Sequence, residues 1–384
     1  MINRRVLGLV LGINQTLSWG MTFYLPAIVA GPAAASLGEA PVAIIGAFSW
    51  SLLISAFCAP RVGRWIDAHG GRGALLISIL VLAAGQVMLA IAPNLAVWYI
   101  GWTVIGVGMA MGLYDAAFAT AGTLLGTEAG PTITGITLLA GFASTVFWSL
   151  GAALIGWLGW RGLLFVYVAI MLLVNLPMVR LLVPPVGARV RTEPPKTAGG
   201  GRPGKLAAVC LATFFTLRWL ITSAIAVHIL PLLQGIGLTL AQAVLVAALI
   251  GPGQVAGRIL EWTVGSRIGL LTRARLGALL FPLAAAALPI GGPIGAGAFA
   301  LMYGMSNGIL TINRGTLPLA MFGAAGYATM LGWFAVPVQL AQALAPTIAA
   351  PLVTGLPAAD VLYLAAGLAF IAALLLLPLR LPRS

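Results

Sequence analysis

The chain has 384 residues, of which 61% are hydrophobic and only 7% are charged. A soluble globule of this composition would lack the polar surface that keeps a protein in solution, so the composition excludes an ordinary soluble fold and indicates that most of the chain is solvated by lipid. The formal net charge of +13 would suit a nucleic-acid-binding protein, but the Lys and Arg residues stand in short gaps between apolar runs, as the positive-inside rule distributes them in an inner-membrane protein.

Each long apolar run is interpreted as a helix, because a helix satisfies its own backbone hydrogen bonds within hydrocarbon. The first six expected helices cover residues 6–30, 41–60, 74–93, 95–122, 132–157 and 161–183. A segment rich in Pro, Gly and basic residues follows at 184–205 and predicts a flexible cytoplasmic linker. The last six expected helices cover residues 206–233, 239–258, 271–290, 293–314, 326–353 and 359–380. The sequence therefore predicts an all-α membrane protein with twelve transmembrane helices, divided into six-helix bundles at 1–183 and 206–384.

The basic residues predict the topology. If the number of crossings is even, all Lys and Arg residues outside the apolar runs fall on one side of the membrane except Arg161. By the positive-inside rule, both termini are then cytoplasmic and the protein lies in a bacterial-type inner membrane.

The two halves also resemble each other. A Gly-Arg-x-x-acid element stands after 41–60 and again after 239–258, at residues 63–67 and 257–261. A Gly-x-x-x-Gly element stands at 108–112 and again at 304–308. Two matches at nearly the same offset indicate an internal repeat of six helices, which predicts two pseudo-symmetric bundles around a central cavity.

The loop over 63–75 resembles the signature of the major facilitator superfamily, Gly-x-Leu-Ala-Asp-Arg-x-Gly-Arg-Lys-x-x-Leu. Arg72 replaces the Lys, and Ala68 and Gly71 depart from the signature; the matching residues are Gly63, Asp67, Gly70 and Leu75. The resemblance implies a secondary transporter that works by alternating access. Its partners would be a small-molecule substrate, the lipid bilayer and in some members H+, and a two-bundle carrier forms its pathway as a monomer.

The signature loop also predicts a cytoplasmic gate. Gly63 and Gly70 permit a tight turn, and Asp67 can lie against a helix N-terminus. Arg64 or Arg72 can reach an acid on a neighbouring helix. Such a cluster would hold the cytoplasmic side shut.

In the family, the acid that completes this gate lies in the fourth helix, where Asp115 stands in this sequence. Asp115 is interpreted as a gate residue, with a proton carrier as the alternative. In the second half, Arg258 and Glu261 occupy the equivalent loop, and Glu261 is expected to pair with Arg314; substrate contact by Arg314 is the alternative.

Arg218 is the most informative candidate for substrate binding. It lies about 13 residues inside the expected helix that follows Lys205, near the bilayer midplane at about 1.5 Å per residue. No acid stands at a matching depth on another helix, so an anionic substrate group such as a carboxylate would balance its charge. A structural pairing with Asp115 or with helix carbonyls is the alternative.

Other polar residues are secondary candidates. His228, further along the same expected helix, is either a proton-coupling residue or an ordinary hydrogen-bonding side chain. Pro252, flanked by Gly251 and Gly253, predicts a break in 239–258 that is either a hinge or a packing kink. Further residues could line the cavity or hold helices together: Asn14, Gln15, Trp19, Tyr24, Tyr114, Thr145, Trp148, Gln254, Tyr303, Asn307, Asn313, Gln339 and Gln342.

The motifs favour transport over catalysis. The sequence has no Walker-type Gly-x-x-x-x-Gly-Lys-Ser/Thr element, no cluster with metal-ligand spacing and no believable catalytic set, so neither an enzyme nor a bound cofactor is expected. A proton-coupled or facilitative carrier of a small organic anion is the leading hypothesis. A drug/proton antiporter is the alternative, although 141–146 lacks the Gly-Pro-x-x-Gly-Gly stretch usual in such antiporters. A transport-inactive receptor that binds a partner through the linker is a third, weaker hypothesis.

Overall fold

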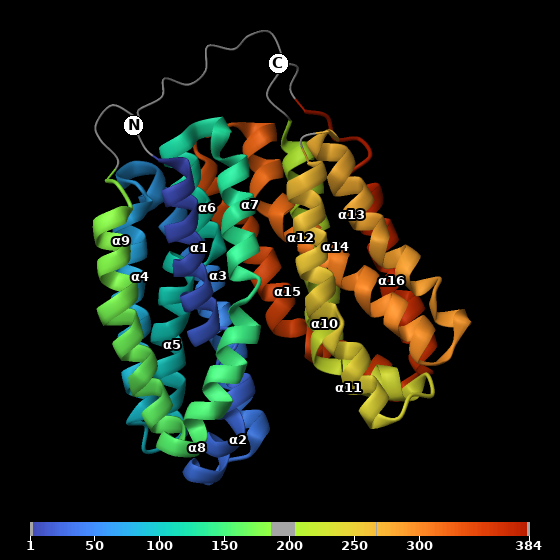
Figure 1. Ribbon diagram of the computed structural model, residues 1–384, viewed down its shortest axis with the longest axis horizontal. Helices are drawn as coiled ribbons and strands as arrows, with labels where there is room; N and C mark the ends of the chain where they lie inside the picture. Colours follow the sequence, from blue (N-terminus) through green and yellow to red (C-terminus); the bar gives the residue numbers. More distant parts are fainter. Residues whose placement is uncertain (1–2, 186–203, 266, 382–384) are drawn as a thin grey trace. The chain divides into compact units, whose positions relative to one another are not determined.

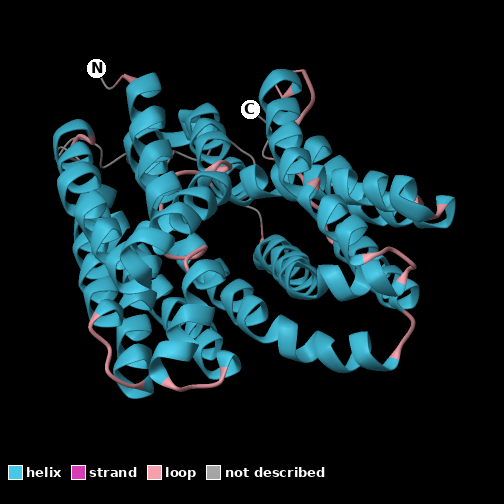
Figure 2. Cartoon of the chain, turned by 60° about the horizontal axis from the view of Figure 1, so that its bottom comes forward, coloured by secondary structure: helices cyan, strands magenta, loops and turns pink. Residues whose placement is uncertain are grey.

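The computed structural model describes residues 3–185, 204–265 and 267–381, and every regular element in these residues is helical (Figures 1 and 2). The predicted all-α class is confirmed. The expected linker at 184–205 lies almost wholly outside the described residues, as do four of its basic residues and Arg383.

The helices of the first half follow the expected ranges but contain internal breaks. In chain order they are α1 (Arg4–Met21), α2 (Pro26–Leu37), α3 (Pro41–His69), α4 (Gly71–Ala90), α5 (Leu95–Gly112), α6 (Tyr114–Leu125), the 3-10 turn Gly126–Ala129, α7 (Gly130–Ala140), α8 (Ala143–Ile170), the π-helical turn Met171–Asn175 and α9 (Leu176–Leu182). The first, fourth and fifth expected helices are each interrupted, and α8 continues through a kink at Gly159, whose φ of 66° is left-handed.

The helices of the second half are α10 (Lys205–Gly235), α11 (Leu240–Ala248), α12 (Ile250–Val264), α13 (Leu270–Ala285), the 3-10 turn Leu288–Ile290, α14 (Gly292–Phe322), α15 (Tyr327–Gly355) and α16 (Ala358–Leu374). The break predicted near Pro252 is present between α11 and α12. Pro252 has no N–H to bond the carbonyl of Ala248, and Ala248 is the last residue of α11.

The lengths of these helices bear on the number of membrane crossings. Eight helical stretches among the described residues are long and apolar enough to cross a membrane, and one of them, Leu95–Leu182, has 88 residues and covers three expected crossings. α16 is shorter, with 17 residues. Every expected range consists mostly of helix, and the count of twelve crossings stays a prediction.

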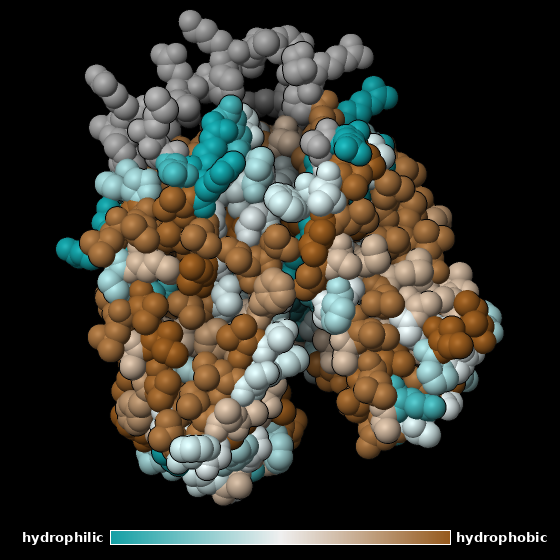
Figure 3. All heavy atoms as spheres, in the orientation of Figure 1, coloured by the Kyte–Doolittle hydropathy of each residue, from teal (hydrophilic) through white to brown (hydrophobic). Residues whose placement is uncertain are grey.

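The described residues form two compact units. Unit 1 comprises those within Met1–Pro195 and Gly323–Val336, and unit 2 comprises those within Lys196–Phe322 and Pro337–Ser384. The expected bundles at 1–183 and 206–384 differ from these units at Gly323–Val336, which contains the start of α15. Apolar side chains cover the flanks of each unit (Figure 3). Helices with apolar outer flanks suit a hydrocarbon surrounding.

The packing of α15 against α3 explains why Gly323–Val336 belongs to unit 1. A Cβ on Gly63 would lie 2.3 Å from the carbonyl oxygen of Ala328, and a Cβ on Gly332 would lie 2.4 Å from that of Ala59. The expected role of Gly63 in a tight turn is therefore wrong, because α3 continues to His69 and Gly63 lies inside it. Gly63 instead lets two helix backbones approach closely. Gly70 does form the turn, with a φ of 84°.

Candidate functional site

A buried guanidinium group lies inside unit 2. Arg218 on α10 is only 1% exposed. Its Nη2 donates hydrogen bonds to Ser306 Oγ at 3.1 Å and to Asn307 Oδ1 at 2.7 Å, both on α14. Its Cζ lies 5.2 Å from the ring centroid of Phe281 and 5.4 Å from that of Tyr303. The contacts that the described residues make to this cation are thus neutral oxygens and aromatic rings.

Two nitrogens of this group have unmet hydrogen-bonding capacity. Within the part of the chain that the structure describes, Arg218 Nε and Nη1 are buried and have no hydrogen-bond partner. A guanidinium carries five N–H donors and is always charged. Burying a charge is costly unless it is paired and hydrogen-bonded. The site therefore holds a positive charge with unused donors.

Neighbouring polar groups fix the side chains around Arg218. Thr222, one turn further along α10, has its hydroxyl oxygen 3.2 Å from Asn307 Oδ1 and 2.9 Å from the Arg218 carbonyl oxygen. Ser306 donates its own hydrogen to the carbonyl of Gly277 at 2.6 Å, so its oxygen is turned to accept from Arg218. Thr222 and Asn307 are half-buried, so this part of the cluster is partly exposed, whereas Arg218 is buried.

The structure brings together three of the predicted substrate residues, Arg218, Tyr303 and Asn307. The sequence did not single out Thr222, Ser306 or Phe281. The spacing of four residues between Arg218 and Thr222, which places both on one helix face, was the signal available for Thr222. No comparable signal existed for Phe281, because contact between α10 and α13 depends on the tertiary packing.

Four predicted residues of unit 1 form an aromatic cluster. The ring centroid of Trp19 lies 4.8 Å from that of Tyr114 and 6.3 Å from that of Tyr24, and Tyr24 lies 5.6 Å from Trp148. Trp148 is 47% exposed and donates its Nε1 hydrogen to the carbonyl of Tyr24 at 3.3 Å. The cluster gives unit 1 a half-buried aromatic surface. Thr145, on the same helix as Trp148, is exposed.

Asn14 and Gln15 lie elsewhere, in the interior of unit 1. Asn14 Nδ2 donates to Asn175 Oδ1 at 3.0 Å, and Gln15 Nε2 donates to the Gly112 carbonyl at 2.7 Å. Both residues are at most 1% exposed. Their amides hold helices together, which is the non-binding role that polar residues often have in membrane helices.

Polar residues of α10 bond the backbone of α15 next to a proline. Pro346 has no N–H for the Gln342 carbonyl, and Ser223 donates its hydroxyl hydrogen to that carbonyl at 2.8 Å. His228 Nε2 lies 3.0 Å from the Pro346 carbonyl oxygen, which can only accept, so Nε2 carries the hydrogen. These bonds join α10 to the backbone of α15. Gln339 on α15 is half-buried, and its Oε1 has no partner among the described residues.

The remaining predicted residues lie on α12, α14 and α6. Gln254 on α12 is half-buried. Asn313 is buried on α14 and donates to the carbonyl of Ile309 at 3.1 Å within its own helix. Asp115 lies in the first turn of α6 and is half-buried.

At the predicted gate, Asp67 lies against a helix N-terminus as expected. Its carboxylate accepts hydrogen bonds from the backbone N–H groups of Ala328 at 3.1 Å and Thr329 at 2.8 Å, and from the Thr329 hydroxyl at 2.6 Å. These residues open α15, where the helix dipole favours a negative charge. The contact lies within unit 1.

The arginines of the same loop do not reach an acid. Arg72 donates to the backbone carbonyl of Arg180, and Arg64 is exposed, with no ion pair among the described residues. The expected contact of Arg64 or Arg72 with an acid on a neighbouring helix is therefore absent from the described contacts.

The acid of the second half has a different partner from the expected one. Glu261 accepts a hydrogen bond from Arg273 Nη1 at 2.7 Å, and Arg314 lies over the ring of Trp219 with its Cζ 5.3 Å from the centroid. Arg273 lies in the first turn of α13, and α13 follows the short loop after the helix that carries Glu261, so the two side chains are close in sequence. Arg258 is 5% exposed, and its Nε and Nη1 have no partner in the described segments. No group of three His, Cys, Asp or Glu side chains that could hold a metal ion occurs in those segments.

Comparisons with known structures identify the fold. The human organic anion transporter MFSD10 (TETRAN) superposes with a TM-score of 0.75 at 15% identity, covering 98% of this chain and 100% of that one. The proton:xylose symporter XylE superposes with a TM-score of 0.73 at 14% identity, covering 97% of this chain and 94% of that one. A single-residue variant of the E. coli fucose:proton symporter FucP gives 0.66 at 17% identity, covering 95% and 97%.

The sequence comparisons give the family. No curated protein matches this sequence. Residues 10–346 match the Major Facilitator Superfamily, and the structural neighbours named above are transporters and not enzymes. The chain is therefore a multi-pass membrane protein that belongs to the major facilitator superfamily.

Proposed function

We propose that this protein is a secondary transporter that moves a small organic anion, such as a carboxylate, by alternating access. Membership of a transporter family supports the general activity. The observation that supports the substrate class is the buried guanidinium of Arg218, which has two nitrogens without a partner and no described acid beside it.

The physical argument starts from the cost of that charge. An ionised side chain within a membrane helix is expensive and usually marks a substrate pathway or a charge pair. A carboxylate can accept two parallel hydrogen bonds from one guanidinium, which adds both energy and orientation. Asn307 and Thr222 are half-buried and lie next to Arg218, so an anion held there would meet these neutral polar groups as well as the cation.

The similar structures are weaker support for the substrate. One of them is described as an organic anion transporter and two as proton symporters. At identities of 14% to 17%, these structural similarities support only the fold. The proposed substrate class therefore depends on Arg218. Asp115 and His228 remain the candidates for proton coupling, and Asp67 with the start of α15 remains the candidate cytoplasmic gate. The inner-membrane location, cytoplasmic termini and monomeric state also remain proposals.

The test is ligand-dependent thermal stability of the purified protein against a panel of organic anions, cations and neutral drugs. A ligand that binds the folded state raises its apparent stability by mass action. We expect an anion to stabilise the native protein and the Arg218→Gln variant to lose that response.

The matched control is Arg275→Gln. Arg275 is also an arginine of unit 2, but its guanidinium bonds backbone carbonyls near the end of the described chain, Leu376 at 3.0 Å among them. This variant is expected to be less stable and to keep the full anion response. Equal loss of response in both variants would contradict a binding role for Arg218.

A drug/proton antiporter is the second candidate, and the aromatic cluster of unit 1 favours it. Ring faces attract organic cations, and Trp148 presents part of its ring at the surface. Stabilisation by cations or neutral drugs only, with an undiminished response in Arg218→Gln, would make this the better assignment.

A further inference from the structure

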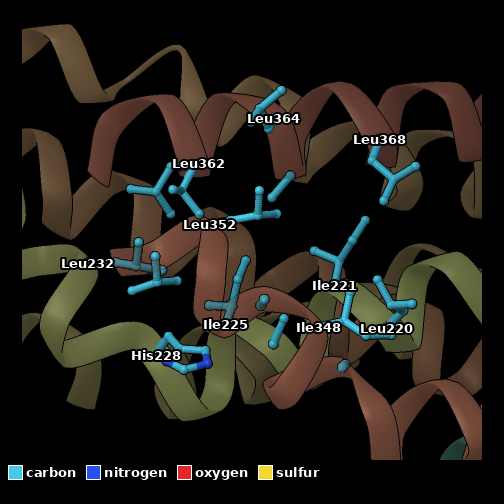
Figure 4. Close-up of a pocket in the computed structure, with 16 residues that line it drawn as sticks. Leu220, Ile221, Ile225, His228, Leu232, Ile348, Leu352, Leu362, Leu364 and Leu368 are labelled. Atoms are coloured by element: carbon cyan, nitrogen blue, oxygen red, sulfur yellow. The ribbon is translucent and has the colours of Figure 1, made fainter. Parts of the chain in front are cut away.

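A cavity in unit 2 lies apart from the Arg218 cluster. It has a volume of about 140 Å³ and is enclosed by α10, α15 and α16 (Figure 4). Fifteen of its sixteen lining residues are Leu, Ile, Val or Ala, and His228 is the exception. The lining therefore contains no Lys, Arg, Asp or Glu that could select a charged solute.

The cavity opens on a surface that is itself apolar. Its rim residues Ile348, Leu352 and Leu364 are 55%, 44% and 54% exposed. In a multi-pass membrane protein, exposed aliphatic side chains on the flanks of helices face hydrocarbon. Deeper in the lining, Ile221, Ile225 and Leu362 are 2%, 3% and 0% exposed. The space thus leads from a lipid-facing rim to residues that the helices otherwise cover.

One end of the cavity lies close to the ends of the three helices that line it. Leu232 lies three residues before the end of α10, Val361 three residues after the start of α16, and Val353 two residues before the end of α15. In Figure 4, His228, Leu232 and Leu362 lie toward one end of the cavity, and Leu220 and Leu368 toward the other.

The length of the cavity fits one leaflet. The lining begins two or three residues from the helix ends and, at about 1.5 Å per residue, spans about 10–18 Å along each helix toward its middle. Half of a hydrocarbon core of about 30 Å is about 15 Å. A lipid chain that enters beside the helix ends and runs along the helices to the bilayer centre has this length and direction.

We propose that this cavity is a binding site for one acyl chain of a bilayer lipid, taken from the leaflet in which α10 ends and α16 begins. The chain would lie between α10, α15 and α16, against the side chains of Ile221, Ile225 and Leu362. Burial of aliphatic surface on both partners supplies the attraction, and shape rather than charge supplies the selectivity. His228 then lies beside a lipid chain, with its Nε2 hydrogen already committed to the Pro346 carbonyl.

The test uses phosphatidylglycerol with a photoreactive diazirine on one acyl chain, in vesicles that hold the reconstituted protein. After illumination, peptide mass spectrometry locates the adducts. We expect adducts on the buried residues Ile221, Ile225 and Leu362, which a lipid reaches only by entering the cavity. A phosphatidylethanolamine probe with the same chain is expected to label the same residues, because the lining carries no fixed charge.

The matched variants are Ala224→Leu and Ala226→Leu. Both add the same atoms to α10, but Ala224 lines the cavity and Ala226 is exposed outside it. Ala224→Leu is expected to reduce the buried adducts severalfold, and Ala226→Leu to leave them unchanged. Ala349→Leu fills the cavity from α15 and replaces Ala224→Leu if that variant fails to fold.

Two results would overturn the proposal. Adducts confined to exposed residues, in equal amounts in both variants, would show that no chain enters the cavity. Protection of the buried residues by a transported solute would assign the cavity to that solute instead of lipid. Neither result depends on whether anions stabilise the protein, so the test is independent of the proposed substrate class.

Discussion

At the scale of the residue, Arg218 shows how a charge can be buried without an ion pair. One nitrogen donates both of its hydrogen bonds, to neutral oxygens, and its Cζ lies near two aromatic rings. Hydrogen bonds and cation–π contacts recover part of the solvation that the guanidinium loses, and the remaining donors keep it available to an anion. The neutral side chain of Asn307 is therefore as important to the site as the charge itself.

Replacing Asn307 with Asp tests this balance. Asn307 Oδ1 lies 2.7 Å from Arg218 Nη2, so the Asn307→Asp carboxylate would form a charge-assisted hydrogen bond with the buried cation. We expect the variant to be more stable by about 1 kcal/mol, because hydrogen bonds to charged groups exceed neutral ones by about that amount. We also expect it to lose the anion response, because the charge is already balanced. Thermal unfolding with and without the stabilising anion measures both effects.

The control is the double variant Arg218→Gln, Asn307→Asp. It keeps the carboxylate but removes its cation, so it is expected to be less stable than either single variant, and the double-mutant cycle isolates the pair. A less stable Asn307→Asp variant that retained the anion response would show that Arg218 does not lack a counter-charge.

At the scale of the element, prolines and glycines determine where helices break and how closely they pack. The helix break before Pro252 follows from the missing N–H, and the side chain of Ser223 compensates for the missing N–H of Pro346 by bonding the freed carbonyl on α15. Close approach of α3 and α15 requires Gly63 and Gly332, because a Cβ at either would collide with a backbone carbonyl. The start of α15 is thereby fixed beside Asp67.

The capping of α15 by Asp67 gives a second prediction. Asp67→Ala removes three accepted hydrogen bonds at the helix N-terminus and is expected to lower stability by about 0.5–2 kcal/mol, the range of helix-capping substitutions. Thr329→Val removes only the hydroxyl bond and is expected to cost about half as much. Amide hydrogen exchange should then accelerate in the first turn of α15.

A matched control for this substitution is Asp360→Ala, which changes an exposed acid in the first turn of α16. Since Asp360 forms no described side-chain hydrogen bond, its loss is expected to change stability by only a few tenths of a kcal/mol. Equal effects at Asp67 and Asp360 would show that the contact with α15 contributes nothing beyond the general charge effect.

At the scale of the whole molecule, membership of the major facilitator superfamily makes the chain a transporter. The internal sequence repeat does not lead to identical contacts. Gly63 approaches the backbone of Ala328 on α15, whereas Gly257, its counterpart in the second half, approaches that of Met305 on α14. A repeated sequence element can therefore support different packing in each half.

The prediction at this scale concerns transport. Purified protein in proteoliposomes loaded with the stabilising anion is expected to catalyse saturable counterflow of the labelled anion without ATP, because the proposed secondary carrier exchanges bound substrate through alternating access. Counterflow should be lost in Arg218→Gln and retained in Arg275→Gln. Binding of the anion with no counterflow in any lipid mixture would favour a receptor over a carrier.

The sequence by itself determined the class and family of this protein. Long apolar runs can exist in lipid only as helices, which indicates the class, and residues 63–75 resemble the family signature. Both are local sequence patterns, so a single sequence is enough to recognise them. The position of Arg218 inside an apolar run, and the ability of Asp67 to accept hydrogen bonds at a helix N-terminus, were also predictable from the local sequence.

Only the tertiary structure decided which side chains meet. Asn14 and Gln15 bond other helices inside unit 1, whereas Asn307 accepts a hydrogen bond from Arg218. Glu261 pairs with Arg273 and not with the expected Arg314. Hydropathy predicts that a polar side chain avoids lipid. Which partner that side chain reaches depends on the rotation of its helix and on the helices packed beside it. The apolar cavity of unit 2 lies between α10 and the consecutive helices α15 and α16, which are far from α10 in sequence, so no local pattern could indicate it.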